Sequence, residues 1–364
     1  MQQPKQSYEA NEDYLQFVPQ KGEDVVHGLV KCKGVTAQNN CVPYAGQLEE
    51  ERDRKLMLAL GPVHIVRDAA KTLVPMRLTL GRQVAIETLV VGLHGGGLPR
   101  WLSSSFPNFQ VDVVERDGAL VSLCRRFLGF QESSNLHLWV GDPFDYLAQT
   151  AAACRQGAEQ RGAGRHAFTG KRYDLILLDG IDGSGHLSPQ YGRLEFVNSV
   201  RNSMGNTGVV AMAVPNRDGR FLYQMTQNWR MAFSGRPVLL IHCITSPTTI
   251  LMTFQDNADR GKANVGSVHN VEEFKDLVRS HMKHYGAGRI LFDLTNEVND
   301  KNFRVLDPGQ TYDLDAYLPR GHPEAVAQLR QQKQAEGWNA WIRRVTGSYL
   351  TPGQRVDLKG GGSS

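Results

Sequence analysis

Five unbroken apolar runs constrain the fold of this chain more than any other feature of the sequence. They cover residues 85–93, 111–117, 136–142, 173–180 and 207–215, and segments with helical spacing of apolar residues separate them. Buried parallel strands read as continuous runs of Val, Ile and Leu, and the helices that connect them cover both faces of the sheet. The alternation therefore predicts an α/β domain with a doubly wound, Rossmann-like sheet.

Two further apolar runs follow at residues 237–244 and 248–254, and only the short link Thr-Ser-Pro separates them. Such a short connection joins antiparallel neighbours, because a parallel pair needs a crossover of a dozen or more residues. We therefore predict a seven-stranded sheet that is mostly parallel and closes with an antiparallel C-terminal hairpin.

The pattern changes at both ends of this region, which divides the chain into four parts. Residues 1–46 are polar and predict an N-terminal arm or small subdomain, and residues 47–256 hold the predicted α/β domain with a helix at its start. Residues 257–350 predict a C-terminal α/β extension. Residues 351–364 include the segment Leu-Lys-Gly-Gly-Gly-Ser-Ser and predict a disordered tail. Within the extension we expect helices at 270–286 and 325–345 and a strand at 289–294.

The composition narrows the classes of function. The chain has 364 residues and a net charge of +4, which is far below the basic bias of proteins that bind through phosphate contacts, so nucleic acid is not indicated. No run of eighteen apolar residues predicts a membrane span. The N-terminus has no signal-peptide pattern, so we expect a cytoplasmic protein and leave an organellar location open. The five cysteines are scattered without a zinc-type spacing, so we expect free thiols and no metal site.

A glycine-rich turn, residues 92–97, follows the first apolar run directly. Glycines at a strand-to-helix turn allow positive φ angles and a close approach of the backbone to a ligand. The N–H groups at the start of the next helix favour negatively charged groups. A tight turn without a ligand is the alternative interpretation, but the position after the first strand favours a nucleotide site.

Acidic residues end the next three runs. Glu115 lies where a carboxylate can accept hydrogen bonds from both hydroxyls of a ribose, and Asp142 could accept from an adenine amino group. Asp145 is equally well explained as a helix N-cap, and Glu115 could be an exposed carboxylate at a strand end. Asp179 and Asp182 follow the fourth run. Ligands bind at the carboxyl ends of the strands in open α/β sheets, so these positions predict one site.

Four segments together make the chain similar to the spermidine-synthase-like branch of class I S-adenosylmethionine-dependent methyltransferases. They are VVGLHGGGLPRWL, VERD, GDPFDYL and YDLILLDGID, and the resemblance covers about residues 50–256. Within the branch, the glycine turn followed by Leu-Pro and the preceding helix DRKLMLAL most resemble a eukaryotic domain that methylates protein amines.

The resemblance implies a cofactor, S-adenosylmethionine, and a set of residues that hold it. Gly92 and Gly96 would be the outer glycines of the turn, with His94 between them as a further cofactor-binding residue. Glu115 would be the ribose ligand and Asp142 the adenine ligand. Asp179 would lie beside the reacting end of the cofactor. Catalysis would consist mainly of positioning an amine of a protein substrate.

Two departures from the family pattern bear on activity. His94 replaces the middle glycine of the turn, where a left-handed conformation would cost about 1–2 kcal/mol and the side chain could crowd the cofactor. Pro143 stands where the family usually has glycine. The spacing of Asp179 and Asp182 matches the acid-x-x-acid segment of aminopropyltransferases, in which the acids hold polyamine charge and help to deprotonate the amine. The Asp-Pro pair of those enzymes is absent, since Gly183 follows Asp182.

Three hypotheses follow. The first is a methyltransferase that acts on a lysine or N-terminal amine of a protein, with Asp179 or Asp182 as the catalytic carboxylate that orients or deprotonates the amine. By analogy with related domains, we expect it to be a homodimer. The second is an inactive methyltransferase fold that serves as a scaffold, and it rests on His94, Pro143 and the long ends 1–46 and 257–364 that the resemblance does not cover. The third is a polyamine aminopropyltransferase. His186, Tyr191 and Asn216 also lie near this edge, and each is at least as well explained by a structural role.

Overall fold

The structure of the protein is a computed structural model. The residues that it describes are 14–17, 28–35, 41–43, 51–61, 63, 85–155, 171–182, 185–215, 219–243, 248–255, 268–281, 293–312 and 314–317. The predicted helix at 325–345 and the predicted tail at 351–364 lie outside the described residues. Among the described residues, no helix is both long and apolar enough to cross a membrane.

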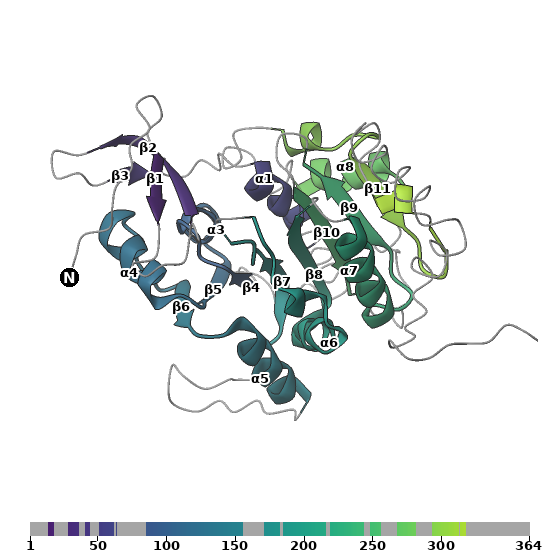
Figure 1. The fold of residues 1–364 in the computed structure, drawn as a ribbon, viewed down its shortest axis with the longest axis horizontal. Helices are drawn as coiled ribbons and strands as arrows, with labels where there is room; N and C mark the ends of the chain where they lie inside the picture. Colours follow the sequence, from purple (N-terminus) through teal and green to yellow (C-terminus); the bar gives the residue numbers. More distant parts are fainter. Residues whose placement is uncertain are drawn as a thin grey trace, which may run out of the picture.

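An eight-stranded mixed sheet forms the centre of the molecule (Figure 1), in the order β11-β9-β10-β8-β7-β4-β5-β6. The five strands from β8 to β6 run parallel, and β10, β9 and β11 pair antiparallel. The predicted parallel sheet with its C-terminal hairpin is therefore confirmed, with one strand more than expected. The strands are β4 (Ile86–Val91), β5 (Phe109–Glu115), β6 (Leu136–Val140), β7 (Tyr173–Leu178), β8 (Met204–Pro215), β9 (Val238–His242), β10 (Thr248–Phe254) and β11 (Phe303–Leu306).

Helices follow the strands in the order that a doubly wound fold requires. In Figure 1, α5, α6 and α7 lie together on the lower side of the sheet, and each packs against the next. A separate sheet of β1 (Tyr14–Phe17), β2 (Gly28–Val35) and β3 (Cys41–Pro43) precedes them. The helices are α1 (Glu51–Met57), α3 (Gly97–Ser105), α4 (Gly118–Phe127), α5 (Pro143–Arg155), α6 (Leu194–Ser203), α7 (Gly219–Ala232) and α8 (Val271–His281), with 3-10 helices η1 (Pro189–Gly192), η4 (Leu294–Glu297) and η5 (Leu314–Tyr317).

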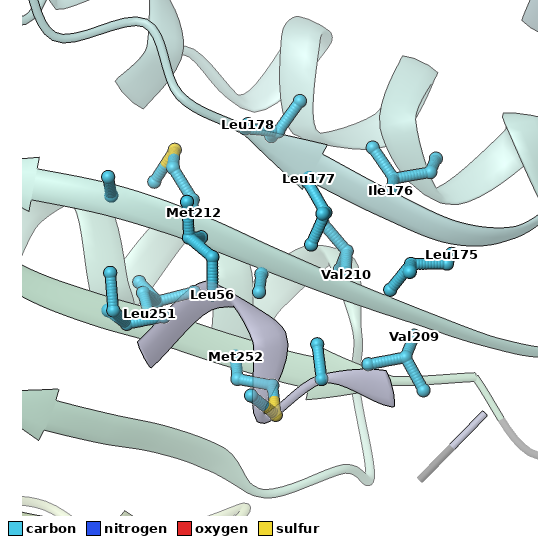
Figure 2. Packing of buried hydrophobic residues seen from close by; sticks show 14 of the residues in the cluster. Leu56, Leu175, Ile176, Leu177, Leu178, Val209, Val210, Met212, Leu251 and Met252 are labelled. Atoms are coloured by element: carbon cyan, nitrogen blue, oxygen red, sulfur yellow. The ribbon is translucent and has the colours of Figure 1, made fainter. Parts of the chain in front are cut away.

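The core lies around the middle strands, and it fixes α1 on the sheet. Every residue of β7 and β10 is buried, as the continuous apolar runs predict. Leu56 and Met57 of α1 are completely buried, and α1 packs on β8 and β10. Figure 2 shows Leu56 close to Met212 and Leu251 of these strands. A short helix that lies ahead of the α/β domain in sequence is thus part of its core.

The C-terminal extension contributes the eighth strand, β11, at residues that the sequence did not single out. Of the strand expected at 289–294, only Asp293 and Leu294 are described, and they begin η4 instead. The carboxylate of Asp293 accepts hydrogen bonds from the backbone N–H and the hydroxyl of Thr295, which starts a helical turn rather than a strand. The strand of this region is β11, which pairs with the outer edge of β9.

Candidate functional site

The carboxyl ends of four parallel strands meet at one edge of the sheet. The backbone N–H of Gly92 donates to β5, that of Asp179 donates to β4, and that of Gly141 donates to the carbonyl of Glu115, at 2.8–2.9 Å. These bonds hold the ends of β4, β5, β6 and β7 in register. The predicted residues Gly92, Glu115, Asp142 and Asp179 therefore follow neighbouring strand ends, where α/β sheets bind ligands.

Two glycines of the turn after β4 are required by their surroundings. Gly92 has a φ of 96° and Gly96 a φ of 75°. A Cβ at Gly92 would lie 2.0 Å from the carbonyl oxygen of Asp179, and a Cβ at Gly96 would lie 2.7 Å from the ring of Phe130. Gly97, the first residue of α3, faces open space, since a Cβ there would meet no atom within 4 Å. The turn thus brings the backbone close to β7 and leaves room above the start of α3.

Glu115 is nearly buried, and backbone N–H groups fix its carboxylate. One oxygen accepts from the N–H of Leu93 in the glycine turn at 2.8 Å, and the other accepts from the N–H of Asp117 at 2.9 Å. Asp117 in turn caps α4 by accepting from two N–H groups of the first turn. Each oxygen of a carboxylate has a second lone pair, so Glu115 can still accept from a pair of hydroxyls.

Asp142 follows β6 and caps α5. Its Oδ1 accepts from the backbone N–H of Phe144 at 2.8 Å, which is the role that the sequence left open for Asp145. Asp145 lies within the first turn of the helix. The second oxygen of Asp142 lies 4.0 Å from the exposed Arg116. A Cβ at the neighbouring Gly141 would meet no atom within 4 Å, so this strand end is open as well.

Three charged residues form a group that we call the Asp179 cluster: Asp179, His94 and Arg52. Asp179 is only 3% exposed, and its Oδ2 lies 3.2 Å from His94 Nε2 and 3.2 Å from Arg52 Nε. Its Oδ1 is buried and has no hydrogen-bond partner among the described residues. Burial would raise the pKa of Asp179, but the guanidinium of Arg52 and the imidazole of His94 hold it below its ordinary value.

His94 adopts the left-handed conformation that its place in the glycine turn implies. Its φ is 47°, and in the described part of the chain no other non-glycine residue has a positive φ. Its Nε2 donates to the carbonyl oxygen of Asp179 at 2.9 Å, and its own carbonyl accepts from the Cys124 thiol. Burial lowers the pKa of His94, yet the carboxylate of Asp179 outweighs burial and raises this pKa to about 9. The imidazole is therefore protonated at neutral pH.

Tyr191, on η1, forms an aromatic wall beside the strand ends. A Cβ at Gly180 would lie 2.3 Å from its hydroxyl, and its ring packs edge-on against Phe144 and Phe196 at about 5 Å between centroids. Burial raises the pKa of Tyr191, and the carboxylates of Glu115, Asp179 and Asp142 raise it further. The hydroxyl therefore stays neutral within the field of all three acids. Asn216 lies outside the described residues.

The two acids of the acid-x-x-acid segment have different surroundings. The side chain of Asp182 is 40% exposed, and its Oδ1 accepts from the backbone N–H of His186 at 2.8 Å. His186 is largely exposed, and its Nδ1 lies 4.0 Å from the same oxygen. Asp182 and His186 thus close a surface loop, whereas Asp179 lies inside the cluster with Arg52.

Arg52 is the residue of this edge that the sequence did not single out. It lies on α1, within a run of charged residues that reads as an ordinary solvated helix face. Only the packing of α1 on the sheet brings its guanidinium to Asp179. The pattern of charged residues along the helix does not indicate that Arg52, rather than Arg54, contacts Asp179.

Comparison with known proteins gives two kinds of relative in sequence, although no family model matches the chain. It is 28% identical over 142 residues to the human eEF1A lysine and N-terminal methyltransferase, a match that covers 37% of this chain and 18% of that protein. The mouse protein of the same name is 26% identical over 222 residues, covering 59% of this chain and 29% of the other. A polyamine aminopropyltransferase from Vibrio vulnificus is 27% identical over 122 residues, with 34% and 35% covered.

The chain thus spans between about a fifth and about a third of the length of these relatives. Among solved structures, the human methyltransferase-like protein 13 in complex with SAH is 19% identical with a TM-score of 0.49, and the alignment covers 67% of this chain and 96% of that one.

Proposed function

We propose that this chain, a spermidine-synthase-like class I methyltransferase by its sheet and its sequence matches, transfers a methyl group from S-adenosylmethionine to an amine of a protein. The name of its relatives makes a lysine or the N-terminus of eEF1A the first substrate to test. Because the chain covers only part of those relatives, their substrate is a proposal for it.

The observation that carries the proposal is the convergence of the glycine turn, Glu115, Asp142 and Asp179 at one edge of the sheet. The edge fits the cofactor: Gly97 and Gly141 leave open space, Glu115 is oriented by two backbone N–H groups, and Asp179 has a buried oxygen with no hydrogen-bond partner among the described residues. We assign the ribose to Glu115 and the adenine to Asp142. When bound, S-adenosylmethionine supplies a methyl group on a sulfonium, which an unprotonated amine can attack.

The surroundings of the two candidate catalytic acids divide their roles. Asp179 faces two cations that lower its pKa, so it is a weak base, and we assign it the positioning of groups at the reacting end. Asp182 is exposed on the loop beside it and is the acid that an incoming protein amine can reach. Holding the amine in line with the methyl group is the main contribution that such a site makes to the rate.

Isothermal titration calorimetry with S-adenosylmethionine and S-adenosylhomocysteine tests the proposal. We expect micromolar binding, and we expect Glu115→Ala to weaken it at least about tenfold, the effect of losing a charge-assisted hydrogen bond. Glu272→Ala on α8 removes an exposed acid elsewhere and serves as the matched control.

Absence of binding to the folded protein would favour the scaffold hypothesis. If the donor binds, mass spectrometry of eEF1A after incubation with donor and enzyme tests the methyl transfer. Spermidine formed from putrescine and decarboxylated donor would favour the aminopropyltransferase hypothesis instead.

A further inference from the structure

The Asp179 cluster places two cations on one oxygen of a buried carboxylate, and the carboxylate of Asp53 lies 3.5 Å from Arg52 Nε. Arg52 and the protonated His94 both face Oδ2 of Asp179 at 3.2 Å, while Oδ1 is buried without a partner among the described residues. A buried polar atom without a partner is rare in proteins, because it loses its hydrogen bonds to water. The cluster therefore offers a hydrogen-bond acceptor and two cations side by side.

The order of the strands places this cluster at one end of the proposed cofactor. Asp142 and Glu115 follow β6 and β5, which would hold the adenine and the ribose, and β4 and β7 come next in the sheet. Neighbouring strands lie about 4.8 Å apart, so the four strand ends span about 14 Å. A donor that extends from β6 across β5 and β4 brings its amino-acid end to β7, where Asp179, His94 and Arg52 lie.

We propose that the Asp179 cluster recognises the zwitterionic amino-acid end of the methyl donor. Arg52 and His94 bind the carboxylate, and Oδ1 of Asp179 accepts a hydrogen bond from the ammonium group. The inference rests on the proposed function and adds a selectivity to it: the chain binds donors that keep the carboxylate and discriminates against the decarboxylated donor of aminopropyl transfer. His94, which departs from the glycine pattern, is then part of the binding site rather than an obstruction.

Contacts between α1 and Glu297 hold Arg52 in position before a ligand binds. Lys55, one turn after Arg52, is completely buried, donates to the backbone carbonyl of Glu297 and lies 3.4 Å from the carboxylate of the same residue. Arg54 lies 3.6 Å from Glu297. The extension thus holds α1 against the sheet, so that Arg52 loses little side-chain freedom when it binds a carboxylate.

Calorimetry with four ligands tests the inference: S-adenosylmethionine, S-adenosylhomocysteine, decarboxylated S-adenosylmethionine and 5′-methylthioadenosine, which lacks the whole amino-acid end. For the natural protein we expect the first two ligands to bind at least about tenfold more tightly than the last two. Arg52→Gln and His94→Gln should each lower the affinity for S-adenosylmethionine about ten- to hundredfold. Each should change the affinity for 5′-methylthioadenosine by no more than about twofold.

Arg279→Gln is the matched control, because it removes the same charge from an exposed residue of α8 that pairs with Asp276 and lies outside the cluster and its support. It should leave the ratio of the two affinities unchanged. Arg52→Lys keeps a charge without the guanidinium and should recover part of the affinity. Circular dichroism of each variant establishes that it is folded.

The outcomes separate this inference from the proposed function. Two results overturn the inference and leave the methyltransferase proposal standing. One is equal affinity of the natural protein for S-adenosylmethionine and its decarboxylated form. The other is that Arg52→Gln loses as much affinity for 5′-methylthioadenosine as for S-adenosylmethionine. If the folded natural protein binds none of the four ligands, the proposed function fails and the inference fails with it. Retained nucleoside binding with a collapsed preference for the carboxylate in Arg52→Gln and His94→Gln supports it.

Discussion

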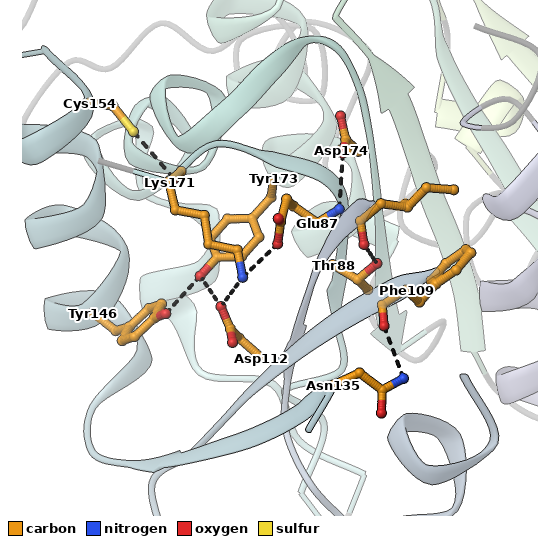
Figure 3. A network of polar contacts seen from close by, with 11 residues as sticks. Glu87, Thr88, Phe109, Asp112, Asn135, Tyr146, Cys154, Lys171, Tyr173 and Asp174 are labelled. Atoms are coloured by element: carbon orange, nitrogen blue, oxygen red, sulfur yellow. Dashed lines mark hydrogen bonds and ion pairs between the residues drawn. The ribbon is translucent and has the colours of Figure 1, made fainter. Parts of the chain in front are cut away.

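Two buried aspartates of this protein each face a cation, yet their carboxylates are satisfied to different degrees. Asp112 belongs to what we call the Asp112 network, together with Glu87, Tyr146, Lys171 and Tyr173 (Figure 3). Its Oδ2 accepts from Lys171 Nζ and from the Tyr173 hydroxyl, both at 2.9 Å, and the hydroxyls of Tyr173 and Tyr146 lie 2.7 Å apart. The Asp179 cluster instead has two cations on one oxygen, and its other oxygen has no hydrogen-bond partner in the part of the chain that the structure describes.

The positions of the two groups explain the difference. Glu87 lies near the start of β4 and Lys171 just before β7, so the Asp112 network lies toward the amino ends of the strands and ties α5 to three of them. The Asp179 cluster lies at the opposite edge, where the strands end. A polar network whose members are hydrogen-bonded or ion-paired to one another across several strands stabilises and specifies a fold. An incompletely paired cluster at the ligand edge has capacity for another molecule, so we expect substitutions in the two groups to affect different properties.

The largest effect on stability should come from Asp112→Ala. It removes the carboxylate that Lys171 and Tyr173 share, which leaves Lys171 with Glu87 and Tyr173 with Tyr146, and the free energy of unfolding should fall by about 3 kcal/mol. Urea unfolding followed by circular dichroism measures this loss. The affinity of the variant for S-adenosylmethionine should stay that of the natural protein. A loss below about 1 kcal/mol, or a weaker ligand affinity, would contradict the separation of the two groups.

An effect of similar size, and one with a pH dependence, is expected at His94. The folded-state pKa of about 9 lies above the ordinary value of 6.5, so protonated His94 stabilises the fold fully below about pH 6.5. This contribution is lost as the pH rises through about 9. The difference in unfolding free energy between the natural protein and His94→Gln should be about 3 kcal/mol larger at pH 6 than at pH 9.5. The same difference for Asp112→Ala should be flat over this range.

The smallest effect should follow Tyr146→Phe, at the rim of the Asp112 network. The substitution removes one hydroxyl, while Tyr173 keeps its bond to Asp112, so the unfolding free energy should fall by only about 1 kcal/mol. Thermal unfolding of this variant and of Asp112→Ala compares the two losses of stability. An equal loss in the two variants would mean that the network depends on the tyrosine pair rather than on the carboxylate.

Much of the fold could be predicted because strands buried on both faces leave a continuous apolar signal. The seven strands of the predicted sheet and the hairpin follow from that signal. Helix α7 was not predicted, although Leu222, Met225 and Trp229 are buried at helical spacing within a polar segment. β11 has only four residues, and pairing with β9 rather than its own pattern makes it a strand.

The site could be predicted as far as chain topology determines it. Gly92, Glu115, Asp142 and Asp179 were identified because the ends of parallel strands meet at one edge. The left-handed conformation at His94 was expected from its place in the turn and is confirmed, but its contact with Asp179 depends on a side-chain direction that sequence does not contain. Arg52 reaches the edge only through tertiary packing of α1, which no local pattern encodes.

The pairing of β11 with β9 has a practical consequence for dividing this chain. A fragment that ended at residue 256, at the boundary expected from sequence, would leave the N–H and C=O groups of β9 unpaired along the rim of the sheet. Exposed strand rims of this kind template the pairing of one copy with another and lead to aggregation. The four residues Phe303–Leu306 therefore act as a protective cover, and the smallest well-behaved unit should extend beyond Leu306.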